Sequence, residues 1–279
     1  MMKDNKGNKV PTVSVILPTY NRAEIIKRSI LSVLKQTYKD FELIIIDDAS
    51  TDNTQLVVEE FNDTRIKYLR NRQNLGPAAS RNIGIKASRG IFIAFQDSDD
   101  EWRPDKLKKQ VETIEKENNK IGVIYSGTIR RFKNNYYYIK APRNILNKRD
   151  VFQRIIPTPS VLVKRECIEK CGFFDKSFPA LEEWDLWIRI NRYYKFRYLD
   201  KLQVISNYTS SSLSTNRIVL AKATFKILVK HINEFISRPV VLLNNLADII
   251  RLFLVHYFLQ INFLNKIKNY FSIKNDHYK

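Results

Sequence analysis

The chain has 279 residues, with 48 Lys and Arg against 29 Asp and Glu and a formal net charge of +19. This length allows one large domain, or one domain with an appendage. A hydrophobic fraction of 44% supports a packed core and excludes a wholly disordered chain. The opening stretch, MMKDNKGNKVP, has no apolar run, so we expect a flexible N-terminus over residues 1–11 and no signal peptide.

Apolar runs alternate with amphipathic stretches through the first half of the chain. Strands are expected at residues 13–17, 41–46, 65–69 and 91–95, and helices at residues 23–35, at 50–61 and from Pro77 onward. The strand runs are polar only at their ends, which is typical of strands buried on both faces. The pattern therefore predicts an α/β fold with a mostly parallel, twisted sheet flanked by helices.

Three of these four strands end in polar residues: PTYNR (18–22), DDAS (47–50) and QDSDD (96–100). Ligands of parallel sheets bind at the carboxyl ends of the strands, so we expect a site where these segments meet. The fourth strand is followed by four acids, Asp97, Asp99, Asp100 and Glu101. Carboxylates suit Mg²⁺ or Mn²⁺, which could bridge them to a diphosphate. The alternative is that they cap a helix starting near Arg103, which explains only one or two of the four.

Other common ligand motifs are missing. The chain has seven glycines, with neither GxGxxG nor GxxxxGK[ST], which argues against a Rossmann dinucleotide site and a P-loop. Its three histidines lie at positions 231, 256 and 277, so the expected sheet region offers no imidazole base. Cys167 and Cys171, four residues apart on an expected helix, predict reduced thiols and a reducing, cytoplasmic location.

Residues 127–150 carry seven Lys and Arg and one acid, interleaved with Tyr136, Tyr137 and Tyr138. Three interpretations stay open for this segment: a nucleic-acid contact, an excursion near an acceptor or a membrane, and a solvated edge hairpin.

The last part of the chain, residues 215–279, predicts a basic amphipathic helical tail. Residues 217–279 hold ten Lys and Arg and three acids, and the apolar run is broken by Arg251, His256 and Gln260. The tail therefore falls short of a membrane span but fits a helix lying on an anionic membrane surface. The alternative is a helical hairpin packed on the catalytic domain or on a second subunit, which would make a homo-oligomer.

Five segments occur in order over residues 12–200: VSVILPTYNR, LIIIDDASTDNT, NLGPAASRNIGIKASRG, IAFQDSDDEW and EEWDLWIR. Together they resemble the successive motifs of family 2 glycosyltransferases, inverting nucleotide-sugar enzymes of the GT-A fold. The resemblance implies a catalytic domain over residues 12–214, with a nucleotide-binding half at 12–102 and an acceptor half at 103–214. It also implies a UDP-sugar donor, Mn²⁺ or Mg²⁺ on a DxD motif, and a hydroxyl acceptor in bacterial surface-glycan biosynthesis.

The resemblance assigns roles to individual residues. Tyr20 would stack on the nucleobase, Asp48 would accept a hydrogen bond from the base imide, and Arg81 would reach the diphosphate or the base. Asp99 would bind the metal directly, with Asp97 beside it. The residues assigned to the nucleotide sugar are Pro18, Thr19, Tyr20, Arg22, Glu24, Asp48, Arg81, Asp97 and Ser98. Trp102 and Trp184 would lie on the acceptor side.

The catalytic base is expected at the start of the EEWDLWIR segment, at Glu183 or Glu182. Related enzymes usually have Glu-Asp at these positions, and the second residue acts as the base. Glu183 keeps that carboxylate and lengthens its arm by one methylene. Helix capping is the alternative for Glu182 and Asp185.

A second class of function is a non-enzymatic protein that binds nucleic acid through the +19 charge. The acidic strand end argues against it, because four carboxylates repel phosphates unless a metal is present, so no nucleic-acid partner is expected. We expect instead a cytoplasmic enzyme, peripheral on the inner face of the cell membrane, whose acceptor is a glycan or a lipid-linked glycan.

Overall fold

Strands β1 (Val13–Thr19) and β2 (Phe41–Asp47) have their apolar side chains buried on both faces, as the sequence predicts for strands of a parallel sheet covered by helices.

The computed structural model describes residues 10–132, 135–139, 150–153, 156–207, 216–255 and 257. Most of the predicted N-terminal segment and the predicted boundary near residue 214 therefore lie outside these residues. The structure contains two compact units, residues 1–177 with 182–209 and residues 178–181 with 210–279.

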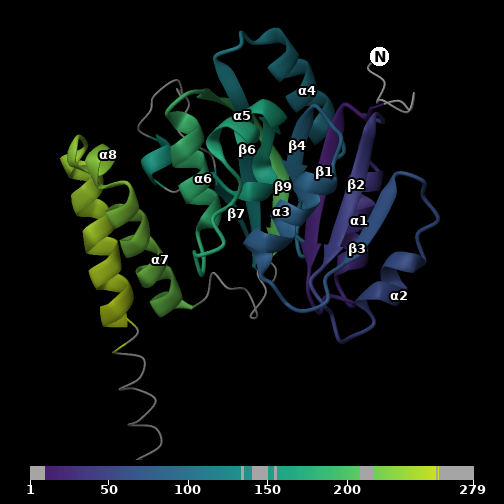
Figure 1. The fold of residues 1–279 in the computed structure, drawn as a ribbon, viewed down its shortest axis with the longest axis horizontal. Coiled ribbons are helices and arrows are strands. Elements are labelled where there is room, and N and C mark those ends of the chain that lie inside the picture. The colour runs from purple at the N-terminus through teal and green to yellow at the C-terminus, as the bar shows by residue number, and fades with distance from the viewer. Residues whose placement is uncertain are drawn as a thin grey trace, which may run out of the picture. The chain divides into compact units, whose positions relative to one another are not determined.

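The first half of the larger unit is the predicted parallel sheet. Strands β3 (Ile66–Arg70) and β4 (Phe92–Phe95) join β1 and β2 in the order β3-β2-β1-β4, and all three pairings are parallel (Figure 1). The β1–β2 register runs from Val13 opposite Phe41 to Thr19 opposite Asp47. The carboxyl ends of these two strands are therefore level.

Helices pack on both faces of this sheet. On one face, alternate β1 residues from Val13 to Leu17 share a core with α1 (Ile26–Leu34). On the other face, α3 (Pro77–Ala87) approaches so closely that a Cβ on Gly84 would lie 2.5 Å from the Ile16 side chain. Glycine at position 84 therefore sets how near α3 comes to the strands.

Two helix starts differ from the prediction. The helix expected at residues 23–35 begins at Ile26, and ahead of it the backbone N–H groups of Arg22 and Ala23 donate to Thr54 Oγ1 and Asp52 Oδ2. The helix expected near residue 103 begins at Lys106. The remaining helices of the larger unit are α2 (Thr54–Glu59), α4 (Lys106–Lys116), α5 (Arg165–Cys171) and α6 (Glu182–Asn191), with 3₁₀ turns at Asp150–Gln153 and Thr158–Ser160.

The second half of the sheet is mixed. Its strands are β5 (Glu101–Trp102), β6 (Ile121–Phe132), β7 (Asn135–Ile139), β8 (Val161–Lys164) and β9 (Lys195–Asn207). The order continues β4-β8-β6-β9-β5: β8 is antiparallel to β4 and β6, β9 is parallel to β6, and β5 is antiparallel to β9.

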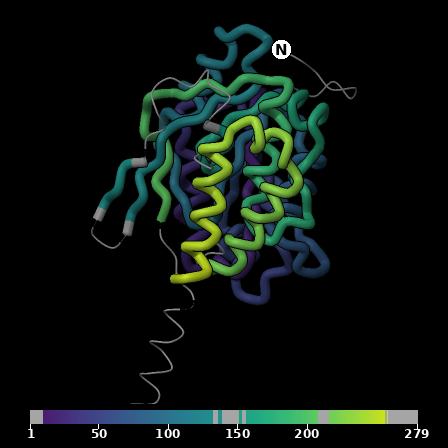
Figure 2. The backbone as a smooth tube through the Cα atoms, turned by 90° about the vertical axis from the view of Figure 1, so that its left-hand side faces the viewer, coloured from purple at the N-terminus to yellow at the C-terminus, as the bar shows by residue number. Residues whose placement is uncertain are grey.

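Strand β7 pairs antiparallel with the end of β6, which is the pairing that the hairpin interpretation of this segment predicts, and Figure 2 shows the two strands side by side. Residues 140–149 lie outside the described part. Cys167 and Cys171 are free thiols, as predicted.

The smaller unit is helical, with α7 (Arg217–Lys230), α8 (Ile232–Ile236) and a helix over residues 239–255. The Asn216 side chain caps α7 by accepting a hydrogen bond from the Val219 N–H at 3.2 Å. Among the described residues, none of the helices is both long enough and apolar enough to cross a membrane.

A lysine lies inside the core of the larger unit. Lys106 on α4 is 0% exposed, and its ammonium group lies 3.8 Å from the centre of the Trp102 ring. It donates to Gln110 Oε1 at 2.8 Å, but forms no ion pair within the described residues. Burial without a compensating charge lowers the pKa of Lys106 well below its ordinary value.

We predict that Lys106→Met flattens the dependence of stability on pH. Because the folded pKa lies below the unfolded value, the unfolded chain binds more protons between the two, so stability falls as pH drops below about 10. Each unit of pKa depression adds about 1.4 kcal/mol to the total loss of stability over this pH range. Urea unfolding at pH 7 and pH 10 measures it, with Lys108→Met, on the exposed side of α4, as the control. An unchanged slope in Lys106→Met would contradict the assignment.

Candidate active site

The polar segments after β1, β2 and β4 meet at one edge of the sheet, as predicted. The Asp48 N–H donates to the Thr19 carbonyl at 2.8 Å, and the Gln96 N–H donates to the Ile16 carbonyl at 2.9 Å. These bonds continue the parallel pairing one residue beyond the strands. They bring Thr19, Asp48 and the acidic loop after Gln96 to the same end of the sheet.

The loops after β1 and β2 are held together by hydrogen bonds. The Asn21 N–H donates to Ser50 Oγ at 2.9 Å, and the Thr51 N–H donates to Asn21 Oδ1 at 2.8 Å. Asn21 (φ 51°) and Ala49 (φ 64°) adopt left-handed backbone conformations, which are costly for residues other than glycine. The surrounding bonds maintain this strain, so the edge of the site has a fixed shape.

Asp48 is 4% exposed, and its carboxylate organises the start of α3. It accepts hydrogen bonds from Asn71 Nδ2 (2.7 Å), the Leu75 N–H (2.9 Å) and the Gly76 N–H (2.7 Å). A carboxylate has about four acceptor positions, so three are already occupied. The predicted contact with a base imide could use only the remaining one.

Asp47, which the sequence did not single out, is completely buried. It accepts a hydrogen bond from the Tyr68 hydroxyl at 2.5 Å and from the Ser50 N–H at 2.7 Å. Burial, and then this bond to Asp47, raises the pKa of Tyr68 above its ordinary value. The pair of aspartates at the end of β2 was visible in the sequence, but not which of the two faces the core.

Arg81 forms the central contact of the site. It is 7% exposed, and it donates to Glu182 Oε1 at 2.5 Å and to Asp97 Oδ1 at 2.9 Å. Burial would lower the pKa of Arg81, but the charges of Asp97, Glu182 and Glu183 outweigh it and raise that pKa. Arg81 therefore joins α3, the acidic loop and α6 in the interior rather than at the surface.

The acidic loop after β4 contains carboxylates in different environments. Asp97 is bound to Arg81, and Glu101 pairs with Arg28 at 3.3 Å and Arg131 at 3.2 Å. Asp100 is 5% exposed, and burial together with the charges of Asp97 and its other neighbour in the loop, Asp99, raises its pKa well above the ordinary value.

Asn207, at the end of β9, holds the acidic loop from the other side. Its side chain donates to the Asp99 carbonyl at 2.8 Å, and its backbone N–H donates to Asp100 Oδ1 at 3.1 Å. Asn207 was not predicted, because nothing local marks a residue 108 positions away from Asp99 as its partner.

Glu182 and Glu183 open α6 and differ in environment. Glu182 is 6% exposed and bound to Arg81, whereas Glu183 is partly exposed. Asp185 does not act as a simple cap: it is completely buried and pairs with Arg189 at 2.9 Å. Arg189 in turn donates to the carbonyls of residues 171, 172 and 173, which fixes the turn ahead of α6.

The other predicted residues divide by exposure. Tyr20 is 44% exposed, Glu24 is exposed, Pro18 and Arg22 are partly exposed, and Thr19 and Ser98 are buried. Trp102 and Trp184 are 4% and 1% exposed, and their indole N–H groups donate to the Pro159 carbonyl (3.0 Å) and the Val151 carbonyl (2.6 Å). Burial of both rings favours packing over the predicted acceptor contact.

Within the described part of the chain, no three His, Cys, Asp or Glu side chains converge as a set of metal ligands. Asp97 and Asp99 offer two partly exposed carboxylates at the end of a strand. This pair fits the way Mg²⁺ is commonly held, by one or two carboxylates together with substrate phosphates.

Comparison with known proteins gives consistent results. The family model "Glycosyl transferase family 2" matches residues 14–177. An Escherichia coli protein, UDP-Glc:alpha-D-GlcNAc-diphosphoundecaprenol beta-1,3-glucosyltransferase WfgD, is 35% identical over 248 residues, which cover 83% of this chain and 91% of that protein.

Two solved structures share the fold. The structure of S. aureus TarS 1–349 in complex with UDP-GlcNAc matches this chain with a TM-score of 0.64 at 22% sequence identity. The match covers 78% of this chain and 66% of the TarS chain. The structure of the Pyrobaculum calidifontis mannosyltransferase PcManGT, in complex with GDP-Man and Mn²⁺, matches with a TM-score of 0.64 at 21% sequence identity. The match covers 81% of this chain and 65% of the PcManGT chain.

The predicted α/β fold is therefore the GT-A fold, and the protein is an enzyme rather than the non-enzymatic nucleic-acid binder considered as the alternative. The chain belongs to glycosyl transferase family 2.

Proposed function

We propose that this enzyme transfers a sugar from a UDP-sugar to a hydroxyl group of a lipid-linked glycan during the synthesis of a bacterial surface glycan. The observation that carries the proposal is the buried bridge from Arg81 to Asp97 and Glu182, which joins the acidic loop to the helix that bears Glu183. The names of the E. coli relative and of the TarS complex support UDP as the nucleotide, and the former supports a diphosphoundecaprenol-linked acceptor.

The reaction is an inverting displacement. The acceptor hydroxyl oxygen attacks the anomeric carbon on the side opposite the diphosphate, and the Glu183 carboxylate takes the hydroxyl proton. The bond between the anomeric carbon and the diphosphate oxygen breaks, and its electron pair leaves with the nucleoside diphosphate. The configuration at the anomeric carbon is therefore inverted.

The environments of the two glutamates favour Glu183 as the base. Glu182 is buried, and its carboxylate already accepts a hydrogen bond from the Arg81 guanidinium at 2.5 Å, so it is less available to an acceptor hydroxyl. Glu183 is more exposed and acts on Arg81 through its charge. Glu182 then has a positioning role, because its bond to Arg81 anchors the start of α6.

Asp97 and Asp99 would hold Mn²⁺ or Mg²⁺, which when bound would supply positive charge for the departing diphosphate. Tyr20, with 44% of its surface exposed at the end of β1, is available to stack on the nucleobase. Arg81 remains a predicted diphosphate or base contact, although two carboxylates already accept hydrogen bonds from it.

We predict that Glu183→Gln lowers transfer by about 10²- to 10⁴-fold, because it keeps the shape of the side chain and removes the base. UDP affinity should change little, since the base faces the acceptor. Release of nucleoside diphosphate from a panel of UDP- and GDP-sugars, with and without acceptor, measures the effect and identifies the donor.

Glu182→Gln is the matched comparison for Glu183→Gln. It should lower the unfolding temperature, because Arg81 loses a charged partner in the interior. Full activity in Glu183→Gln beside an inactive but normally stable Glu182→Gln would move the base one residue back.

We predict that Asp99→Ala abolishes the stabilisation of the protein by UDP with Mn²⁺ and leaves its own unfolding temperature nearly unchanged, because this side chain is partly exposed. Thermal unfolding with UDP plus Mn²⁺, against UDP plus EDTA, measures the difference. Glu112→Ala, an exposed acid on α4, is the control. Normal metal-dependent stabilisation and turnover in Asp99→Ala would show that another residue binds the metal.

The helical unit supports a peripheral position on the inner face of the membrane. On the helix over residues 239–255, Val240, Leu243, Ile250 and Leu254 repeat at helical spacing and are 51–69% exposed. Large exposed apolar patches commonly mark membrane or protein contacts. Basic residues near an anionic surface add about 1 kcal/mol each.

We predict that Leu243→Glu combined with Ile250→Glu weakens binding of the full chain to phosphatidylglycerol vesicles at low salt. Added salt should weaken the binding of the unmodified chain as well. Asn244→Glu, exposed on another side of the same helix, is the control for charge. A fall in molar mass by light scattering, without any change in vesicle binding, would instead assign this face to a homo-oligomer.

A further inference from the structure

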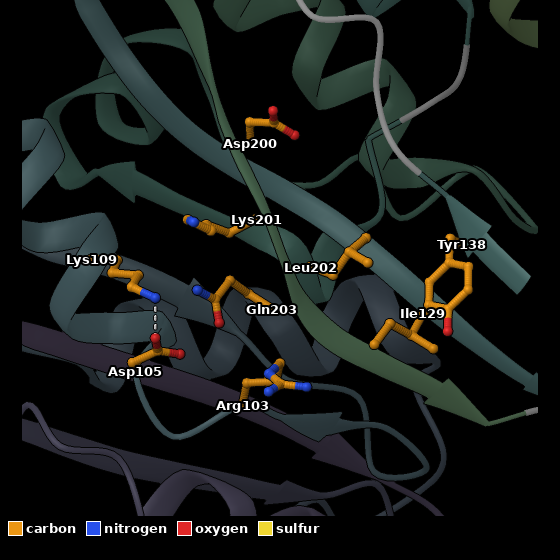
Figure 3. A pocket seen from close by; sticks show the side chains of 9 residues that line it. All are labelled: Arg103, Asp105, Lys109, Ile129, Tyr138, Asp200, Lys201, Leu202 and Gln203. Atoms are coloured by element: carbon orange, nitrogen blue, oxygen red, sulfur yellow. Dashed lines mark hydrogen bonds and ion pairs between the residues drawn. The ribbon is translucent and has the colours of Figure 1, made fainter. Parts of the chain in front are cut away.

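A cavity of about 490 Å³ lies on the catalytic unit between α4 and strands β6, β7 and β9 (Figure 3). Its lining residues are Arg103, Asp105, Lys109, Ile129, Tyr138, Asp200, Lys201, Leu202 and Gln203. None of them belongs to the active site described above. The Arg103 N–H donates to the Gln203 carbonyl at 2.9 Å, which joins the segment before α4 to β9 within the cavity lining.

One polar atom of the lining lacks a partner inside the protein. Gln203 is 2% exposed, and its Oε1 is buried without a hydrogen bond to any residue that the structure describes. A buried acceptor left unpaired costs about 1–3 kcal/mol, so it normally has a partner. Because Gln203 lines the cavity, a bound water or a ligand hydroxyl would supply the missing donor.

The charges of the lining leave an excess of positive charge. Lys109 and Asp105 form an ion pair with each other. Arg103 and Lys201 form no ion pair with the other described residues, so beside that ion pair the lining holds two cations and one further carboxylate, Asp200. A ligand with a negative charge would balance this excess, and an arginine can bind a carboxylate with two parallel hydrogen bonds.

The opposite wall is apolar and carries an aromatic ring. Tyr138 lies opposite Ile129 in the β6–β7 register, and it is 66% exposed beside Ile129 and Leu202 (Figure 3). An exposed ring next to polar side chains suits a molecule with one apolar face and hydroxyl groups at its rim. A sugar ring has this shape, since its C–H groups pack on an aromatic face while its hydroxyls reach polar groups.

We propose that this cavity binds an anionic saccharide as a subsite for the acceptor glycan, separate from the reaction centre. In this subsite Tyr138 stacks on a sugar ring, Gln203 Oε1 accepts a hydroxyl hydrogen bond, and Arg103 or Lys201 pairs with the anionic group. The assignment of the saccharide to the acceptor rests on the proposed function. Arg103 follows Asp99 by four residues, which span at most about 14 Å, so one oligosaccharide can reach both places.

Calorimetric titration of the full chain tests the proposal, with tetragalacturonate as the anionic probe and maltotetraose as the neutral probe. Neither donor nor metal is present. Tetragalacturonate should bind the unmodified chain more tightly than maltotetraose. Tyr138→Ala should weaken its binding at least tenfold, and Lys201→Ala should reduce the preference for the anionic probe.

Tyr137→Ala is the matched control. Tyr137 is 55% exposed on the same strand, and its side chain points to the opposite face of the sheet, so binding should be unchanged. The proposal is overturned by equal losses in the two tyrosine variants, or by binding of both probes weaker than about 1 mM. It is also overturned if phosphatidylglycerol vesicles, rather than saccharides, lose affinity in Tyr138→Ala.

The two proposals fail in different measurements. Saccharide binding without nucleoside diphosphate release from any donor would sink the glycosyl-transfer assignment and keep the subsite as a saccharide site. Transfer activity with Tyr138→Ala and Tyr137→Ala indistinguishable in the titration would sink the subsite alone.

Discussion

The site depends on one buried cation. Arg81 binds carboxylates from two segments, one of them 101 residues away in the chain, and so links the strand-end loop to α6. Removing one partner from a buried ion pair typically costs about 3–5 kcal/mol, because the remaining charge stays in the interior. Loss of Arg81 would leave Asp97 and Glu182 uncompensated together. The guanidinium therefore maintains the geometry on which Glu183 depends.

The acidic loop is compatible with a strongly basic chain because its members have separate partners. Arg81 neutralises Asp97, and two arginines neutralise Glu101. Burial beside like charges raises the pKa of Asp100, which favours its neutral form. The repulsion within the cluster is thus reduced by groups of the protein itself.

The second half of the sheet connects the two proposed binding regions. Glu101 forms an ion pair with Arg131 on β6. Two residues later, the Arg103 backbone N–H donates to the Gln203 carbonyl on β9, and Arg103 lines the cavity proposed as the saccharide subsite. The short strand β5 therefore lies between the acidic loop and the proposed saccharide subsite. An acceptor held in this cavity would be positioned by elements that are hydrogen-bonded directly to the acidic loop.

Local patterns in the sequence were sufficient for the parallel half of the sheet, for the helix that starts at Pro77, and for the strand-end position of the acids, because strand periodicity and helix signals act over a few residues. Only the tertiary structure decided the antiparallel insertion of β8, the burial of Trp102 and Lys106, and the pairing of Arg81 with Glu182. Each of these depends on which distant segments pack together. No local pattern specifies that choice, since it is made by close packing and by the need to compensate buried charge.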